Sequence, residues 1–146
     1  RGYVGLHSKS PWDAPKIDPN YLSDSEGKDL ATLKRGVKLA HQILLSSEFD
    51  HLRLGNTLPY PSGELTEELI EKHIEMATEC VYHPIGTCKM GNDASSVTDP
   101  KTLRVKGING LRVIDASIMP DLVSGNTNSI VMAIGEKGSD LILNNY

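Results

Sequence analysis

A histidine-proline pair followed by two closely spaced glycines constrains this chain more than any other feature. His83 precedes Pro84, and Gly86 and Gly91 follow. The proline ring disfavours helical geometry at the residue before it, so His83 is expected on an extended loop, and the glycines permit tight turns after it. A second loop rich in glycine and asparagine, residues 124–128, precedes the last apolar segment. Two polar loops of this kind predict an active site assembled from separated pieces.

The first half of the chain predicts a strand and a long helix. Residues 2–7 have the composition of a short strand, and the prolines that follow predict an irregular loop up to residue 22. Ser23 and Glu26 have the spacing of a capping box, which predicts a helix over residues 26–46. Apolar residues recur at helical spacing within it: Leu30, Leu33, Val37, Ala40 and Leu44.

The segment before His83 predicts a second helix. Thr66 is expected to cap it, with Glu67 and Glu68 near its positive pole. This helix is expected to lead directly into His83, after a turn-rich connection over residues 55–63. Its apolar face comprises Leu69, Ile70, Ile74, Ala77 and Val81.

The second half of the chain predicts a hairpin and a final helix. Asn109-Gly110 favours a two-residue turn between arms at residues 103–108 and 111–115, and the second arm is apolar enough to enter a buried sheet. The final helix is expected to start near residues 126–128 and to end near residue 144. Gly135 and Gly138 weaken a helix, so they predict close packing there. Its buried side should comprise Ile130, Ile134, Leu141 and Ile142.

The composition excludes several classes of partner. The net charge is -4, and no basic stripe is available to neutralise phosphates, so no nucleic acid or anionic membrane is expected. No apolar run approaches the roughly 20 residues that span a bilayer, so this segment is expected to contain no membrane span.

Two cysteines, Cys80 and Cys88, are too few for a disulfide framework. They are compatible with two buried thiols or, in a secreted protein, with one bridge. With His83 they supply three metal ligands, whereas a structural zinc site takes four. No metal is therefore expected.

Many short pieces of the chain, in the same order, resemble the C-terminal part of the glucose-methanol-choline (GMC) oxidoreductases, particularly the choline and glucose dehydrogenase type. The resemblance implies an α+β fold in which residues 1–95 form part of a substrate-binding domain that includes the catalytic-histidine loop. Residues 96–146 would supply the last strand and helix of a Rossmann-like FAD-binding domain. The matching pieces are Arg1 to Val4, Asp18 to Leu22, His83 to Met90, Val97 to Pro100, Leu103 to Val105, Gly107 with Ile108, Gly110 to Ser117 and Gly125 to Asn128.

The resemblance also implies a flavoprotein that oxidises a small-molecule alcohol, with FAD as its cofactor. An alcohol carbon releases hydride only as its hydroxyl proton departs, so a base must lie beside the hydroxyl. His83 matches the catalytic histidine of the family, and Asn126 matches the second catalytic position, where it would hold the substrate oxygen through its amide. The positions implied to contact the cofactor are Asp115, Ala116, Thr127 and Asn128.

The sequence leaves two other functions to weigh. Ser117 or Ser124 with His83 and Asp115 has the composition of a nucleophilic triad, but no G-x-S-x-G elbow is present. Alternatively, the chain is a non-catalytic remnant or interaction module that keeps the fold.

The ADP-binding fingerprint of the family, G-x-G-x-x-G after a strand, is missing from these 146 residues. Without it the pyrophosphate of FAD has no cradle. We therefore expect a fragment whose partner is the missing N-terminal FAD-binding portion of the same chain. Alone, it is expected to bind FAD weakly and to be inactive.

Overall fold

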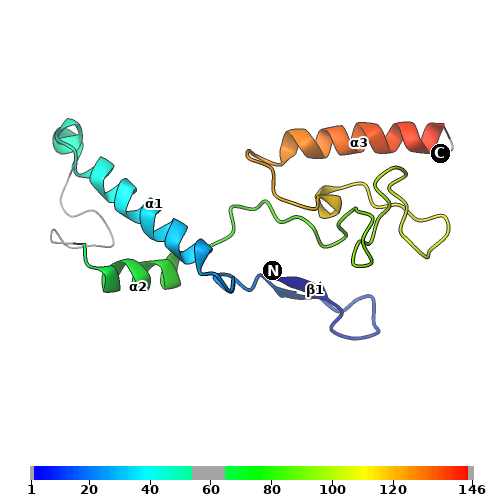
Figure 1. The fold of residues 1–146 in the computed structure, drawn as a ribbon, viewed down its shortest axis with the longest axis horizontal. Helices are drawn as coiled ribbons and strands as arrows, with labels where there is room; N and C mark the ends of the chain where they lie inside the picture. The colour runs from blue at the N-terminus through cyan, green and yellow to red at the C-terminus, as the bar shows by residue number, and fades with distance from the viewer. Residues whose placement is uncertain (1, 54–64, 145–146) are drawn as a thin grey trace. The chain divides into compact units, whose positions relative to one another are not determined.

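The computed structural model describes residues 2–53 and 65–144, in which helices combine with one small sheet (Figure 1). This is the expected α+β composition. The chain divides into two compact units, Arg1–Glu79 and Cys80–Tyr146. The turn-rich connection predicted at 55–63 lies outside the described residues. No helix in the described part is long and apolar enough to cross a membrane.

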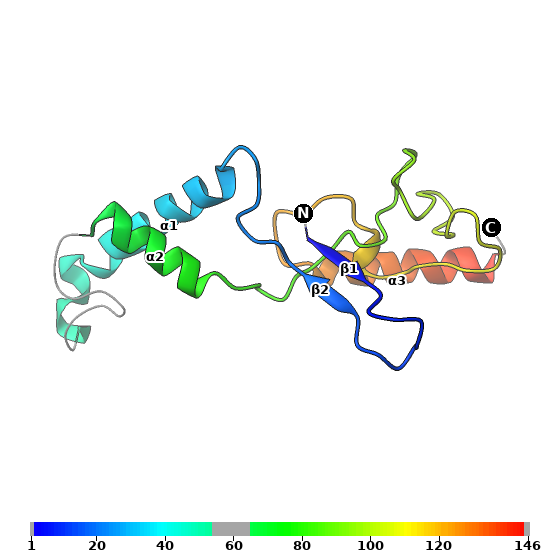
Figure 2. The ribbon, with the colours of Figure 1, turned by 90° about the horizontal axis from the view of Figure 1, so that it is seen from below.

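Unit 1 begins with a two-stranded antiparallel sheet, labelled in Figure 2. β1 (Tyr3–Gly5) pairs with β2 (Lys16–Asp18), and Val4 lies opposite Ile17. The predicted strand at residues 2–7 therefore exists but is shorter. The prediction of an irregular loop up to residue 22 is wrong at β2, where the three residues between Pro15 and Pro19 pair with β1. This pairing is possible because prolines are tolerated just outside an edge strand.

The long helix α1 spans Lys28–Leu44, within the predicted range. The predicted capping box of Ser23 and Glu26 is wrong, because the N-cap is Gly27, with a φ of 64°. The Ser23 hydroxyl donates instead to the carbonyl oxygen of Asn20 at 2.7 Å. The Asp24 carboxylate accepts the first free N–H group of the helix, from Lys28 at 2.5 Å. A short 3-10 helix, η1 (Ser47–Leu52), follows α1.

Helix α2 spans Glu67–Ala77, and its predicted cap is confirmed: Thr66 Oγ1 accepts the Leu69 N–H at 3.3 Å. Ile70 and Ile74 are buried as expected. Val81 lies beyond the helix and is 77% exposed, so its predicted place on the apolar face is wrong. The helix ends six residues before His83 and does not lead directly into it.

Charged side chains join α1 to α2. Lys34 forms an ion pair with Glu71, and Lys38 forms one with Glu67. The hydrogen bond from Lys38 lowers the pKa of the Glu67 carboxyl, because it stabilises the ionised form. These lysines therefore help to pack the helices against each other.

Unit 2 contains the 3-10 helix η2 (Ala116–Ile118) and the helix α3 (Asn128–Leu143). Isolated bridges join its loops to one another, at Met90 with Thr98, Thr98 with Val105, and Arg104 with Arg112. Its described residues include no strand of the kind expected at 111–115. Leu103, Ile118 and Leu141 form the core, which brings η2 against α3. The residues packed around this core are Met90, Val113, Ile114 and Ile134.

The predicted hairpin is confirmed only in the pairing of residues 103–105 with 111–113, and its predicted turn is wrong. Val105 N–H donates to Leu111 O at 2.9 Å, and Val113 N–H donates to Leu103 O at 3.1 Å. A two-residue turn needs positive φ at Asn109 and Gly110, but only Gly110 has it, at 78°. The chain turns earlier as well, at Gly107 (φ 77°), so the connection is five residues long.

Helix α3 matches its predicted extent, but its packing is only half as expected. Leu141 is buried and Ile134 half-buried, whereas Ile130 and Ile142 are 38% and 52% exposed because only one side of the helix packs in this unit. Gly138 packs against the side chain of Ile114, as predicted. Gly135 does not, since a Cβ there would meet no atom within 4 Å.

Candidate active site

The His83 loop is held by backbone conformation and by hydrogen bonds to η2. Tyr82 has a φ of 59° and Gly86 a φ of 84°, so the chain turns on both sides of the His83-Pro84 pair. A Cβ at Gly86 would lie 3.3 Å from the Met119 carbonyl oxygen, which leaves little room for any other residue. The expected fixed loop with a glycine turn is therefore confirmed.

Two backbone hydrogen bonds join this loop to η2. Cys88 N–H donates to Ser117 O at 2.9 Å, and Met90 N–H donates to Ile118 O at 2.8 Å. Thr98, which is fully buried, donates its hydroxyl to the Cys88 carbonyl at 3.0 Å. The sequence alone assigned no role to Thr98. Its one distinguishing feature there was that it lies in Val97 to Pro100, a piece that resembles the GMC family.

His83 meets the second predicted loop at one atom pair. Its Nδ1 lies 3.0 Å from Thr127 Oγ1, a hydrogen bond between residues 44 positions apart. His83 is half-buried, and Thr127 is 7% exposed. The structure thus brings together the two loops that the sequence singled out.

Asn126 directly precedes Thr127 and is exposed. No other described residue forms a hydrogen bond with its amide, which remains available to an external oxygen. The placement beside Thr127 puts Asn126 next to the residue that contacts His83. A base and an amide donor therefore lie in neighbouring segments.

The first turn of α3 offers free donors at the same place. The earliest intrahelical bond runs from Val131 N–H to Thr127 O at 2.9 Å, and the helix has no side-chain cap. The N–H groups of Asn128, Ser129 and Ile130 accordingly have no acceptor within the described part of the chain. Free N–H groups at a helix start attract negative charge. Their chemistry fits the carbonyl-rich pyrimidine edge of a flavin.

Ala116 is the first residue of η2, and Asp115 is its N-cap. The Asp115 carboxylate caps this element by accepting Ser117 N–H at 2.8 Å and Ser117 Oγ–H at 2.5 Å. The carboxyl oxygen that makes these bonds, Oδ1, is therefore occupied by the turn itself. Asn128 is exposed, and among the described residues its amide nitrogen has only a long contact, with Met132 Sδ at 4.0 Å.

The alternatives with other chemistry do not assemble among the described residues. Ser117 donates to Asp115, and His83 pairs with Thr127, so the nucleophile-to-base hydrogen bond of a triad is missing. Cys80 and Cys88 are free thiols. The described histidine, cysteine and acidic side chains form no cluster of three or more that could hold a metal.

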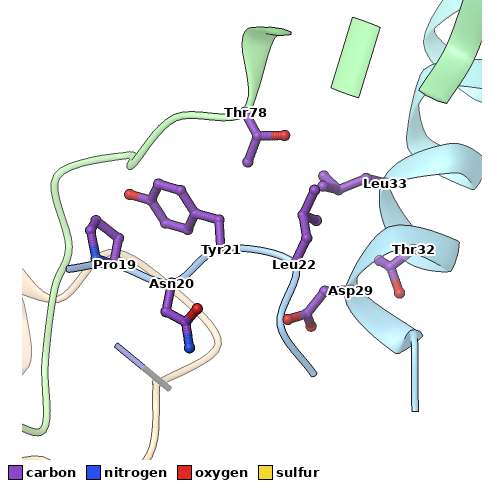
Figure 3. Close-up of a pocket in the computed structure, with 8 residues that line it drawn as sticks. All are labelled: Pro19, Asn20, Tyr21, Leu22, Asp29, Thr32, Leu33 and Thr78. Atoms are coloured by element: carbon purple, nitrogen blue, oxygen red, sulfur yellow. The ribbon is translucent and has the colours of Figure 1, made fainter. Parts of the chain in front are cut away.

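A separate pocket of about 370 Å³ lies in unit 1, and Figure 3 shows its lining. Tyr21, Leu22 and Leu33 supply its apolar side, and Asp29 is its one carboxylate. None of the predicted catalytic or cofactor-contacting residues lines it. The candidate active site is therefore the His83–Thr127 region of unit 2.

Comparison with known proteins identifies the family. The family model described as GMC oxidoreductase matches residues 1–135. An alcohol dehydrogenase [acceptor] of Pseudomonas putida is 42% identical over 143 residues, which are 98% of this chain and 25% of that protein. Choline oxidase of Arthrobacter globiformis is 41% identical over 144 residues, covering 97% of this chain and 26% of the oxidase.

A solved structure supports the same assignment. The FAD-dependent oxidoreductase from Chaetomium thermophilum superposes with a TM-score of 0.81 at 25% identity, over 99% of this chain and 24% of that one. The chain spans about a quarter of the length of the relatives it matches. Both the sequence match and the shared fold lead to one conclusion: this chain belongs to the GMC oxidoreductase family.

Proposed function

We propose that this chain is the C-terminal portion of an FAD-dependent enzyme that oxidises the CH–OH group of a small alcohol, with His83 as the catalytic base. The observation that carries the proposal is the 3.0 Å hydrogen bond between His83 and Thr127, which joins the histidine loop to the start of α3. In this proposal residues 1–95 belong to the substrate-binding domain, and residues 96–146 complete the FAD-binding domain.

The His83 imidazole removes the hydroxyl proton of the alcohol. Histidine suits this task because an unperturbed imidazole, with a pKa of about 6.5, accepts a proton near neutral pH. As the proton leaves, negative charge develops on the substrate oxygen. The chemistry that a bound flavin supplies is acceptance of the hydride released from the alcohol carbon, so the alcohol loses one proton and one hydride and becomes a carbonyl compound.

Asn126 stabilises the developing charge. Its amide donates to the same oxygen, and donation from a fixed dipole strengthens as the oxygen becomes more negative. The exposure of Asn126 and its lack of a partner among the described residues support this role. Since Asn126 cannot take a proton, His83 is the single base of the pair.

Residues at two element starts would hold the flavin. The free N–H groups of Asn128 and its neighbours would donate to the pyrimidine edge, and the N–H of Thr127 lies in the same turn. Asp115 and Ala116 would contribute from η2, the aspartate by holding the turn in shape. The pyrophosphate would be bound by the rest of the longer protein.

The test uses the full-length protein that contains this chain. Purified His83→Ala and Asn126→Ala variants are mixed anaerobically with a panel of alcohols, and flavin reduction is followed by its absorbance. Loss of the base is expected to slow reduction by about 10²–10⁴-fold, and loss of the amide donor by about 10²–10³-fold. His51→Ala, an exposed histidine in η1, serves as the matched control and should reduce at the wild-type rate.

Reduction of flavin by His83→Ala within threefold of the wild-type rate would exclude the proposed base. A protein that binds flavin but is reduced by none of the alcohols would favour the non-catalytic module. The 146-residue chain alone is expected to retain no flavin after gel filtration and to show no turnover. Stoichiometric flavin in that sample would contradict the proposed dependence on the rest of the protein.

A further inference from the structure

The hydroxyl of Thr127 does not cap helix α3, although its N-cap position predicts that it would. Thr127 is the N-cap of α3, where a threonine side chain ordinarily accepts an N–H of the first turn. Here it makes no such bond, and its backbone is helical (φ -71°, ψ -16°) instead of extended. The hydroxyl is directed to His83 Nδ1 at 3.0 Å, in a position that is 93% shielded from solvent.

The two nitrogens of His83 therefore have different surroundings. Nδ1 is paired with Thr127, whereas no described residue contacts Nε2 with a hydrogen bond. A neutral imidazole carries its proton on one nitrogen and offers a lone pair on the other. Only a lone pair on Nε2 can receive the proton of an incoming hydroxyl, because Nδ1 already faces Thr127.

We propose that Thr127 is a positioning residue that accepts a hydrogen bond from Nδ1–H of His83 and so keeps Nε2 unprotonated as the base. The inference rests on the proposed function of His83. When Nε2 takes the substrate proton, both nitrogens carry hydrogen and the bond from Nδ1–H to Thr127 Oγ1 persists. The ring therefore needs no reorientation during proton transfer, and the acceptor oxygen stabilises the cation that forms.

Replacing Thr127 by valine or by serine separates the effect of its oxygen atom from the effect of its shape. Valine has nearly the shape of threonine but no oxygen, so Thr127→Val removes the acceptor and little else. No cap is lost, since the hydroxyl does not cap α3. Serine keeps the oxygen, so Thr127→Ser is the conservative control.

The first experiment reads the tautomer directly. Full-length protein with its flavin is prepared with ¹⁵N-labelled histidine, and the His83 signals are assigned by their loss in His83→Gln. We expect the neutral ring to carry its proton on Nδ1 and its lone pair on Nε2. A wild-type ring with its proton on Nε2 would overturn the inference without reference to any variant.

The second experiment measures kcat/KM with the best alcohol of the panel. Thr127→Val is expected to lose about 10–100-fold, mostly in kcat, because outer hydrogen-bond partners and the correct tautomer have effects of that size or larger in other enzymes. Thr127→Ser should stay within about threefold of wild type, and both variants should keep their flavin.

The outcomes separate this inference from the proposed function. If His83→Ala is inactive but Thr127→Val is as active as wild type, only the role of Thr127 is refuted. If His83→Ala is fully active, the proposed base is refuted and the role of Thr127 with it. Should Thr127→Val fail to fold, the wild-type tautomer still decides the inference.

Discussion

Gly138 and Gly135 lie on the same helix, and replacing each with alanine should have opposite effects on the stability of α3. Either change gains helix propensity of up to about 1 kcal/mol. At Gly138 the new Cβ would lie against Ile114, whose Cγ2 is the nearest atom, with Cδ1 at 2.7 Å and Cγ1 at 3.1 Å, whereas at Gly135 it would meet nothing within 4 Å. Overpacking of this kind costs about 1–3 kcal/mol. Gly138→Ala is therefore expected to destabilise α3 by about 0–2 kcal/mol, and Gly135→Ala to stabilise it by up to about 1 kcal/mol.

Hydrogen exchange in the full-length protein measures this difference locally. The free energy of opening is obtained by mass spectrometry for peptides that cover Asn128–Leu143. The two variants should differ by about 1–3 kcal/mol, since their propensity gains cancel in the comparison. Adding Ile114→Val to Gly138→Ala removes one methyl group from the contact and should recover part of the loss. Equal stabilities of the two single variants would refute the packing argument.

Two further predictions concern the supports of each unit. The hydrogen bond from Lys38 lowers the pKa of the Glu67 carboxyl in the folded state, so its stabilising effect is complete above the unfolded pKa and is lost as the pH falls through the folded pKa. The free energy of opening of α2, obtained from hydrogen exchange after correction for the intrinsic exchange rate at each pH, should therefore fall on acidification, and should fall less steeply in Glu67→Gln. Equal pH profiles of the two proteins would contradict this. Thr98→Val leaves the part-buried Cys88 carbonyl without its hydroxyl donor, so it should lower the thermal stability by the equivalent of about 1–3 kcal/mol. Thr87→Val, at an exposed position, should have no measurable effect.

Local signals in the sequence were sufficient wherever one residue and its near neighbours decide the structure. Thr66 caps α2 through a hydrogen bond from the residue three positions later, and the positive φ of Gly86 turns the chain at that residue. The extent of α3 follows from its apolar periodicity and the polar loop before it. These features depend on backbone geometry that a short window contains.

Competition between neighbouring signals explains the local errors. Ser23 and Glu26 have capping-box spacing, but Asp24 is a stronger acceptor and Gly27 takes the left-handed conformation at the helix start. Asn109-Gly110 is a strong turn dipeptide, yet Gly107 provides another left-handed residue three positions earlier. A pattern shows that a turn or cap is available, and the rest of the chain decides which is used.

The site was only partly predictable for a different reason. Sequence reasoning could single out the His83 loop and the start of α3, because both contain residues that fix the backbone. It could not indicate that Thr127 faces Nδ1, since the same threonine is an ordinary N-cap residue by its position. Nor could it indicate that buried Thr98 bonds to the loop, because contacts across many residues leave no periodic pattern.

Helix α3 is fastened at both ends. At its start Thr127 is bonded to His83, and near its end the Leu141 carbonyl accepts from the Arg112 guanidinium at 3.5 Å, while Arg112 Nε donates to Thr102 O at 3.0 Å. A rod held at two points cannot slide along its own axis without breaking one of them. The two contacts lie about 20 Å apart, given a rise of about 1.5 Å per residue, so an axial displacement of α3 would disturb both the Arg112 contact and the hydrogen bond to His83.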